Sequence, residues 1–328
     1  MECSSISLSD SVLHTSWNYS GERYAAACND GSIQIWSRRN ESGDAPFSCT
    51  SQWKAHNGPV LKVVWAPPEF GDMVVSCSTD GCVTLWEEVA EGDGDDTWRL
   101  CSHLEQSRTT VLDVQFGNCL SGLKLVTAGA DGHVKIYETT NTLELKHWQL
   151  QAEFSSVPAL KEGTGKVSCT AASISWRPPV DSIQRPVFVL GYCSSSQQVG
   201  PAKVWEFAEA YQRWQLLAEL AEPNEKLEPV HHVSWAPNVG RPYELIAVSS
   251  GRAVSIWRLE FSSDSQGRIS VSRVAHLQDH NSEVWHLDWD MSGMTLATSG
   301  SDGNVRLWQA SFGGQWQQQG IVASMRES

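Results

Sequence analysis

An aromatic residue ends a short, alternating, strand-like segment six times along this 328-residue chain. These closing aromatics are spaced 50 to 52 residues apart except for one step of 68, and they are Trp36, Trp86, Tyr137, Trp205, Trp257 and Trp308. A second series, the opening aromatics, precedes the first by 19 to 29 residues and comprises Trp17, Trp65, Phe116, Trp176, Trp235 and Trp289. Two series that stay in phase over six periods indicate one repeated structural unit.

Each period predicts four β-strands. An apolar segment such as MVVSCS at 73–78 lies between the opening and closing aromatics. In four periods it meets the closing segment through Asp-Gly, which favours tight hairpins because glycine accepts positive φ. Proline ends several opening segments, as in WAPP at 65–68, and a less regular fourth strand follows the closing aromatic, as at 47–53. Four strands per period predict an all-β, six-bladed β-propeller.

We expect one propeller domain over residues 1–328. Its blades are expected at about 11–53, 56–104, 107–153, 166–220, 228–275 and 280–322. The fourth blade departs from the pattern, with a surface insertion expected near the Ser-rich segment 194–201, and the fifth has Ser250-Gly251 in place of Asp-Gly. The run EEVAEGDGDD at 87–96 holds six acids in ten residues and is interpreted as a solvated loop between blades.

Composition excludes several classes of function. The formal net charge is −14, with no basic stretch beyond Arg38-Arg39, so direct binding to nucleic acid or to anionic lipid is disfavoured. Nine cysteines without a C-x-x-C motif indicate reduced core residues in an intracellular protein. The N-terminus lacks the basic region of a signal peptide, and no apolar run approaches the roughly 18 residues of a membrane span. We therefore expect a soluble intracellular protein.

Two histidines, His56 and His280, lie nine residues before an opening Trp. This pattern resembles WD repeats, in which a His, a strand Ser or Thr, a turn Asp and the closing Trp form a buried hydrogen-bonded tetrad. The resemblance implies two complete tetrads, which are His56, Ser76, Asp80, Trp86 and His280, Thr298, Asp302, Trp308. Such His/Ser/Asp sets also suggest a hydrolase, but their recurrence with the blade repeat favours a structural role.

No cofactor or metal site is expected. The string formed by His280, Glu283 and His286 has a metal-like spacing, but Glu283 and His286 would point to opposite faces of a strand. The pair His231-His232 fails for the same reason. The chain has no phosphate-binding glycine loop, no nucleophile elbow and no paired carboxylates in a shared cleft, so no catalytic residue and no small-molecule substrate are predicted.

Three segments resemble a particular family more closely than WD repeats in general. They are 65–88, 235–248 and 280–308, with an EFG turn and a GRPY turn that generic WD repeats do not share. These segments resemble the small WD-repeat nucleoporin called the Sec-thirteen homologue, and the similarity runs from about residue 12 to 322. Blade 4 and residues 87–100 match least.

The resemblance implies a scaffold subunit of the Y-shaped outer-ring complex of the nuclear pore, at the nuclear envelope, that supports mRNA export and protein transport. In that family the propeller is open, and a helical-solenoid nucleoporin inserts one blade in trans between the last and first blades. Other Y-complex subunits are further partners. Family members also belong to the SEA/GATOR nutrient-signalling complex at vacuolar or lysosomal membranes, and a related protein scaffolds the COPII coat.

The residues are compatible with an open propeller. Residues 316–322 can form the outer strand of blade 6, so blade 6 does not need a strand from the N-terminal part of the chain. We expect a docking cleft at about 11–36 and 280–322, with five tryptophans as candidate partner-binding residues: Trp17, Trp36, Trp285, Trp289 and Trp316. Residues 4–9 are an alternative latching strand that would close the ring.

Two other functions are weighed against the scaffold. Substrate adaptors of cullin ubiquitin ligases usually carry W-D-x-R after a closing strand, and the nearest string here, Trp36-Ser37-Arg38, lacks the Asp. A propeller hydrolase would need a polar axial pocket with perturbed acids.

Overall fold

The structure is a computed structural model of the chain. It describes residues 11–38, 47–90, 96–104, 109–119, 122–139, 141, 145–157, 168–179, 185–194, 200–223, 228–261, 269–311 and 313–323. The chain divides into two compact units, 1–154 and 155–328. That residues 1–328 form a single domain stays a prediction.

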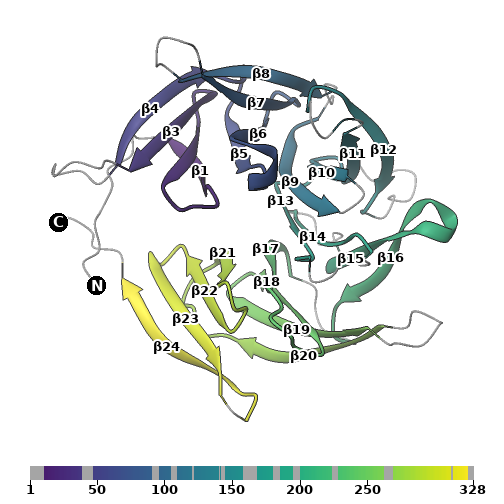
Figure 1. Ribbon diagram of the computed structural model, residues 1–328. Helices are drawn as coiled ribbons and strands as arrows, with labels where there is room; N and C mark the ends of the chain where they lie inside the picture. The colour runs from purple at the N-terminus through teal and green to yellow at the C-terminus, as the bar shows by residue number, and fades with distance from the viewer. Residues whose placement is uncertain are drawn as a thin grey trace. The chain divides into compact units, whose positions relative to one another are not determined.

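The first unit contains three four-stranded antiparallel sheets, each made of strands consecutive in the chain (Figure 1). Blade 1 comprises β1 (Val12–Trp17), β2 (Arg23–Cys28), β3 (Ser32–Arg38) and β4 (Phe47–Lys54). Blade 2 comprises β5 (Val60–Trp65), β6 (Met73–Ser78), β7 (Val83–Ala90) and β8 (Asp96–Leu104). Blade 3 comprises β9 (Val111–Cys119), β10 (Gly122–Gly129), β11 (His133–Thr139) and β12 (Trp148–Ser155).

The second unit repeats this arrangement in three further sheets. Blade 4 comprises β13 (Ala171–Trp176), β14 (Val187–Cys193), β15 (Ala202–Ala208) and β16 (Arg213–Leu220). Blade 5 comprises β17 (Val230–Trp235), β18 (Glu244–Ser250), β19 (Ala253–Phe261) and β20 (Ile269–Leu277). Blade 6 comprises β21 (Val284–Trp289), β22 (Thr295–Gly300), β23 (Asn304–Ala310) and β24 (Trp316–Ala323). Two short 3-10 helices, η1 (Pro68–Phe70) and η2 (Glu209–Tyr211), lie in turns.

The Asp-Gly turns have a local chemical cause. In blade 1 the Asp30 carboxylate accepts hydrogen bonds from the backbone N–H and the hydroxyl of Ser32, at 2.9 and 2.7 Å. Gly31 then adopts φ +87°, in the region where a side chain would be strained. Asp80, Asp131 and Asp302 accept the backbone N–H two residues ahead in the same way. The turn therefore folds from its own residues.

The core consists of apolar layers between neighbouring blades. In the first unit, Val60, Val63 and Trp65 of β5 are buried against blade 1, where they pack with Ile33 and Ile35. In the second unit, the opening strand β21 packs in the same way against blade 5. The opening strands β9 and β17 pack in the same way on blades 2 and 4, so within each unit an opening strand covers the face of the blade before it.

One interior contact is ionic. Lys62 on β5 and Asp113 on β9 form an ion pair with an Nζ–Oδ1 distance of 2.5 Å. The Asp113 side chain is fully buried and that of Lys62 is 11% exposed. Neither series of aromatics predicts this pair, because it depends on which inner-strand residues of blades 2 and 3 meet.

The structure corrects the interpretation of residues 87–96. Residues 87–90 extend β7, and β8 begins at Asp96, so the acidic run belongs to the hairpin within blade 2 and not to a loop between blades. Two of its acids are paired: Glu87 contacts Arg99 at 2.5 Å, and Glu88 contacts Arg23 at 2.6 Å.

Residues 91–95 lie outside the described part of the chain, as do 195–199 of the blade 4 insertion and the latch candidate 4–9.

The hairpin turn between the second and third strands of blade 5 lies one residue later than the sequence indicates. Ser250 pairs with Ala253 across the hairpin, so the two turn residues are Gly251 and Arg252. Gly251 has φ +55°, as expected for a Gly-first hairpin turn.

Candidate functional site

The blade 2 tetrad is a five-residue network in the structure. His56 Nε2 lies 2.8 Å from the Ser76 hydroxyl, and His56 Nδ1 lies 3.3 Å from the Asp80 carboxylate. The Trp86 indole N–H donates to the Thr84 hydroxyl at 2.9 Å, and Thr84 in turn contacts Ser76 at 3.0 Å. Thr84 therefore links the tryptophan to the other three residues, a role that the sequence pattern does not reveal.

The blade 6 tetrad contains an arginine that sequence reasoning missed. The Trp308 indole N–H donates to the Thr298 hydroxyl at 2.9 Å, and His280 Nε2 lies 2.7 Å from the same oxygen. Arg306 lies between the remaining two members, with its Nη1 2.8 Å from His280 Nδ1 and 2.7 Å from the Asp302 carboxylate. The guanidinium bridges His280 and Asp302, whose own separation is 3.9 Å.

Both networks are buried and their polar groups partner one another, so they stabilise blades and do not form a reactive centre. His56 is 4% exposed and His280 is 3% exposed. Burial lowers the pKa of both imidazoles, and Arg306 lowers that of His280 further, while Asp80 and Asp302 act in the opposite direction. Both histidines are therefore held neutral at physiological pH.

This burial predicts acid sensitivity. Because the folded-state pKa of His56 and His280 lies below the ordinary value of 6.5, the unfolded chain binds more protons once the pH falls below that value. We expect the free energy of unfolding to decrease between pH 6.5 and pH 5, by at most about 1.4 kcal/mol per pH unit for each histidine. Urea unfolding at pH 7.5, 6.5 and 5.5 measures the slope. The His280→Gln variant should have a shallower slope, and a slope equal to that of the parent chain would contradict the assignment.

Blade 1 has an uncovered inner strand. The strand register makes Val12, Thr15 and Trp17 of β1 the counterparts of Val60, Val63 and Trp65 of β5. Trp65 is 8% exposed, whereas Trp17 is 51% exposed, and Thr15 is exposed where Val63 is fully buried. Of the residues that join blade 2 to blade 1, Val63 and Trp65 thus have exposed equivalents on blade 1, and the equivalent of Val60 is half-buried.

The same strand lacks a hydrogen bond that recurs elsewhere. The Trp65 indole N–H donates to the carbonyl of Ser16 in blade 1 at 2.9 Å, and that of Trp289 donates to Ser234 in blade 5 at 3.1 Å. Trp17 occupies the equivalent position, and its indole N–H has no such acceptor among the described residues. Among the described residues, its ring contacts those of Tyr24 and Phe47, both in blade 1.

Blade 6 has an uncovered face as well. Ala247, Val254 and Ile256 of blade 5 are fully buried beneath blade 6. Their counterparts, which we call the terminal face of blade 6, are only half-buried at Ala297, Val305 and Leu307. On the outer strands the contrast is larger: Leu277 is 7% exposed, and its counterpart Val322 is 51% exposed. The terminal face therefore has the composition of a blade interface without the cover.

The five candidate tryptophans differ in accessibility. Trp17 is 51% exposed and Trp285 is 50% exposed. Trp285 contacts the ring of His231 with centroids 4.8 Å apart. Trp36 is half-buried against Tyr24, and Trp316 is half-buried against Trp289.

Trp289 is 8% exposed and bonded to Ser234, so it belongs to the core between blades 5 and 6 and is not available to a partner. Val305, Leu307 and Val322 lie within the expected cleft range 280–322, but sequence reasoning did not name them as candidate residues. The signal that could have found them is the alternation of apolar residues along the two strands.

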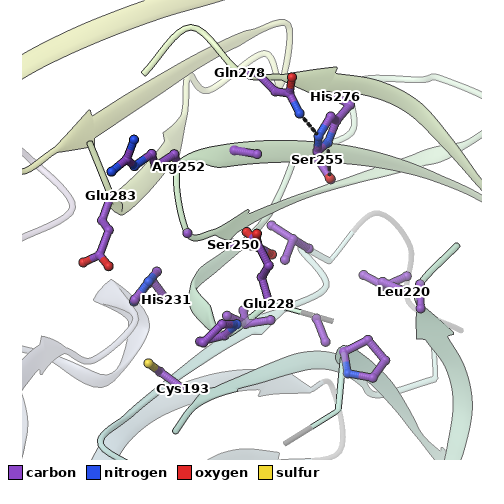
Figure 2. Close-up of a pocket in the computed structure, with 18 of the residues that line it drawn as sticks. Cys193, Leu220, Glu228, His231, Ser250, Arg252, Ser255, His276, Gln278 and Glu283 are labelled. Atoms are coloured by element: carbon purple, nitrogen blue, oxygen red, sulfur yellow. Dashed lines mark hydrogen bonds between the residues drawn. The ribbon is translucent and has the colours of Figure 1, made fainter. Parts of the chain in front are cut away.

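A cavity of 1190 Å³ lies in the second unit, beside the hairpin turn of blade 5 (Figure 2). Glu228, His231, Arg252 and Glu283 are among the residues that line it, and Arg252 lies beside Glu283 (Figure 2). His276 is held by Ser255 at 3.1 Å and by Gln278 at 2.8 Å. Burial lowers the pKa of His231, which Glu283 and Glu228 raise. Charges of both signs face this hollow, which fits a hydrated surface better than a single charged ligand.

The metal-like histidine string does not converge. His280 is bound into its tetrad, Glu283 precedes β21, and the His286 ring lies 4.3 Å from that of His232. Within the described ranges, no group of three or more His, Cys, Asp or Glu side chains is arranged to hold a metal ion. Among the same residues, no helix has the length and apolar character needed to cross a membrane.

The chain is similar in sequence to known WD-repeat proteins. Residues 47–87 and 271–309 match the family described as WD domain, G-beta repeat. The chain is 43% identical to Protein SEH1 of Arabidopsis thaliana over 98% of each chain. It is 35% identical to Nucleoporin SEH1 of Homo sapiens, over 95% of this chain and 85% of that protein, and equally similar to that of Xenopus tropicalis. The chain belongs to the SEH1 family of nucleoporins.

Membership of the SEH1 family, together with the six four-stranded sheets, confirms the predicted fold class, an all-β six-bladed WD-repeat β-propeller. The SEH1 family is a family of non-catalytic WD-repeat scaffolds, so the chain is not an enzyme. Its nucleoporin relatives support a structural role in the nuclear pore complex and a location there. The tetrads accordingly stabilise blades, and the uncovered surfaces are the candidates for function.

Proposed function

We propose that this chain is a scaffold subunit of the outer-ring Y complex of the nuclear pore, and that it accepts one β-blade from a helical-solenoid nucleoporin. The observation that carries the proposal is the terminal face of blade 6, where Val322 is 51% exposed and the equivalent Leu277 of blade 5 is 7% exposed. In this role the chain supports mRNA export and protein transport at the nuclear envelope. A second assembly, SEA/GATOR at the vacuolar or lysosomal surface, would use the same face.

The strand order supports a partner in trans. Blade 6 obtains its outer strand, β24, from its own C-terminal segment, and all four strands of blade 1 come from residues 12–54. Among the described strands, neither sheet borrows one from the other, so no shared sheet joins the terminal blades within the described part of the chain. An apolar sheet face left in this condition is stabilised when another protein covers it.

The composition of the terminal face favours a sheet as the covering element. On blade 5 the equivalent face receives the inner strand of the next blade, with Val284, Leu287 and Trp289 packed on it. Half-buried Ala297, Val305 and Leu307 reproduce that receiving surface on blade 6. Covering it would bury apolar area at about 25 cal/mol per Å².

The Leu307→Arg variant tests the proposal. A guanidinium on the terminal face would have to be buried without a partner, so we expect the Kd for the solenoid nucleoporin to rise at least roughly tenfold. Isothermal titration with the purified chain and an N-terminal fragment of the solenoid nucleoporin measures it. The control is Gln319→Arg, which introduces the same guanidinium at an exposed position of β24. Equal affinities for both variants and the parent chain, or no binding by the parent chain, would refute the proposal.

A further inference from the structure

Three described large apolar side chains are exposed by more than 75%, and all three lie in the turn between the first and second strands of a blade. They are Tyr19 at 80%, Val239 at 76% and Met291 at 86%, in blades 1, 5 and 6. We propose that each of these turns is a docking tip that enters an apolar hollow, rimmed by Lys or Arg, on the protein that supplies the extra blade. The inference rests on the proposed function, and it adds a second contact surface to it.

The tips of blades 1 and 6 are built alike. Each turn begins with an Asx residue directly after the opening Trp, followed by the exposed apolar residue, a serine and a glycine. Asn18 Oδ1 accepts the backbone N–H groups of Glu22 and Arg23 at 3.2 and 3.1 Å. Asp290 Oδ1 accepts those of Met294 and Thr295 at 2.8 and 2.9 Å. The glycines, Gly21 and Gly293, adopt φ +71° and +66°. Two turns with the same internal bonding hold Tyr19 and Met291 in defined positions.

The tip of blade 5 is fastened to that of blade 6. Arg241, in the GRPY turn, donates from Nη1 to the Gly293 carbonyl and from Nη2 to the Pro237 carbonyl, each at 2.6 Å. Asn238 accepts the backbone N–H of Arg241 at 2.7 Å and donates to the Tyr243 carbonyl at 3.3 Å. A Cβ at Gly293 would lie 2.0 Å from the Pro237 carbonyl oxygen, so the two turns touch backbone to backbone. Val239 and Met291 are therefore presented by one rigid element.

Rigid exposure is what distinguishes these residues from ordinary surface hydrophobes. A single exposed apolar side chain needs no explanation. Here the turn backbone is cross-linked by hydrogen bonds while its apolar tip remains in water, at three equivalent places. A tip already held in its bound conformation loses little conformational entropy when a partner binds.

The charges around the tips select the partner's chemistry. The two arginines of these turns are engaged internally: Arg23 makes two contacts of 2.6 Å to Glu88, and Arg241 binds carbonyls. Glu22 and Asp288 are exposed, and their carboxylates make no hydrogen bond or ion pair with another described residue. The uncompensated charge beside the tips is negative, so a basic rim on the partner is favoured and an anionic membrane is not.

The tip of blade 1 also continues an uncovered surface. Tyr19 follows the exposed Trp17 by two residues. A partner whose blade covers β1 ends beside this tip.

Removal of the tips tests the inference. We expect the triple variant Tyr19→Ser, Val239→Ser, Met291→Ser to bind the full-length solenoid nucleoporin about tenfold more weakly than the parent chain, with unchanged thermal unfolding. Its affinity for the isolated blade segment of that nucleoporin should be unchanged. The matched control is Tyr211→Ser, which removes a side chain 68% exposed in another turn. Raising the salt concentration should weaken the binding of variant and parent alike, because the exposed carboxylates of Glu22 and Asp288 are present in both.

The outcomes separate the two proposals. If the triple variant binds full-length partner like the parent chain while Leu307→Arg binds weakly, the tips are not docking elements and the blade proposal stands. If the parent chain binds no solenoid nucleoporin, both proposals fail. Flotation of the parent chain with vesicles containing phosphatidylserine, abolished in the triple variant, would overturn the inference in favour of a membrane contact.

Discussion

Replacing Asp113 by alanine is expected to lower the free energy of unfolding by about 3–5 kcal/mol, the largest loss we expect from a single polar residue. The Asp113 carboxylate is fully buried and lies 2.5 Å from the Lys62 ammonium, which is 11% exposed. Truncation at Asp113 leaves that ammonium inside blades 2 and 3 without its counter-charge. Urea unfolding followed by tryptophan fluorescence measures the change.

Two controls separate the buried charge from packing. The double variant Lys62→Met, Asp113→Leu removes both charges, and we expect most of the lost stability to return. Glu87→Ala breaks a pair of the same 2.5 Å length whose side chains are 60% and 26% exposed, and it should cost no more than about 1 kcal/mol. A loss at Asp113 as small as the loss at Glu87 would show that Lys62 finds other solvation in the blade.

Replacing Trp308 by alanine should destabilise the chain by a similar amount, about 3–5 kcal/mol. Trp308 is 1% exposed, packs with Leu287 and Leu296 in the core between blades 5 and 6, and donates its indole N–H to Thr298. The substitution removes core volume and a donor to the tetrad at once. The midpoint of thermal or urea unfolding reports the effect.

Trp308→Phe separates the two contributions. The phenyl ring retains most of the apolar contact, so the remaining loss of about 1–2 kcal/mol would come from the missing hydrogen bond to Thr298. Trp285→Ala is the control for tryptophan removal at a position that is 50% exposed, and it should change stability by less than about 1 kcal/mol. If Trp308→Phe were as damaging as Trp308→Ala, the hydrogen bond would dominate over packing.

Much of the fold could be predicted because its signals are local. The closing aromatics lie on the third strand of each blade, since alternation and the Asp-Gly turn place Trp86 and Trp308 without reference to the rest of the chain. The acidic run 87–96 was misinterpreted for the same reason. A run of acidic residues indicates an exposed loop. Glu87 and Glu88 instead continue strand β7, because each forms an ion pair with a neighbouring arginine.

The candidate site was less predictable. The histidines and turn aspartates of the tetrads follow from their spacing in the sequence. Thr84 and Arg306 belong to the hydrogen-bond networks only because the folded blades bring them into contact with His56 and His280. Among the five tryptophans, composition could not distinguish Trp17 from Trp289. The first is uncovered, and the second is buried by blade 5.

The sequence by itself determined the six repeats, the strand and turn positions, the tetrad histidines and the family, because strand periodicity and turn chemistry act over a few residues. The tertiary structure alone decided the Lys62–Asp113 pair, the Arg306 bridge and the exposure of Leu307, Val322, Tyr19 and Met291. A residue is buried only when another part of the structure packs on it. Residues at equivalent positions of two blades therefore differ in exposure when one blade is covered by its neighbour and the other is not.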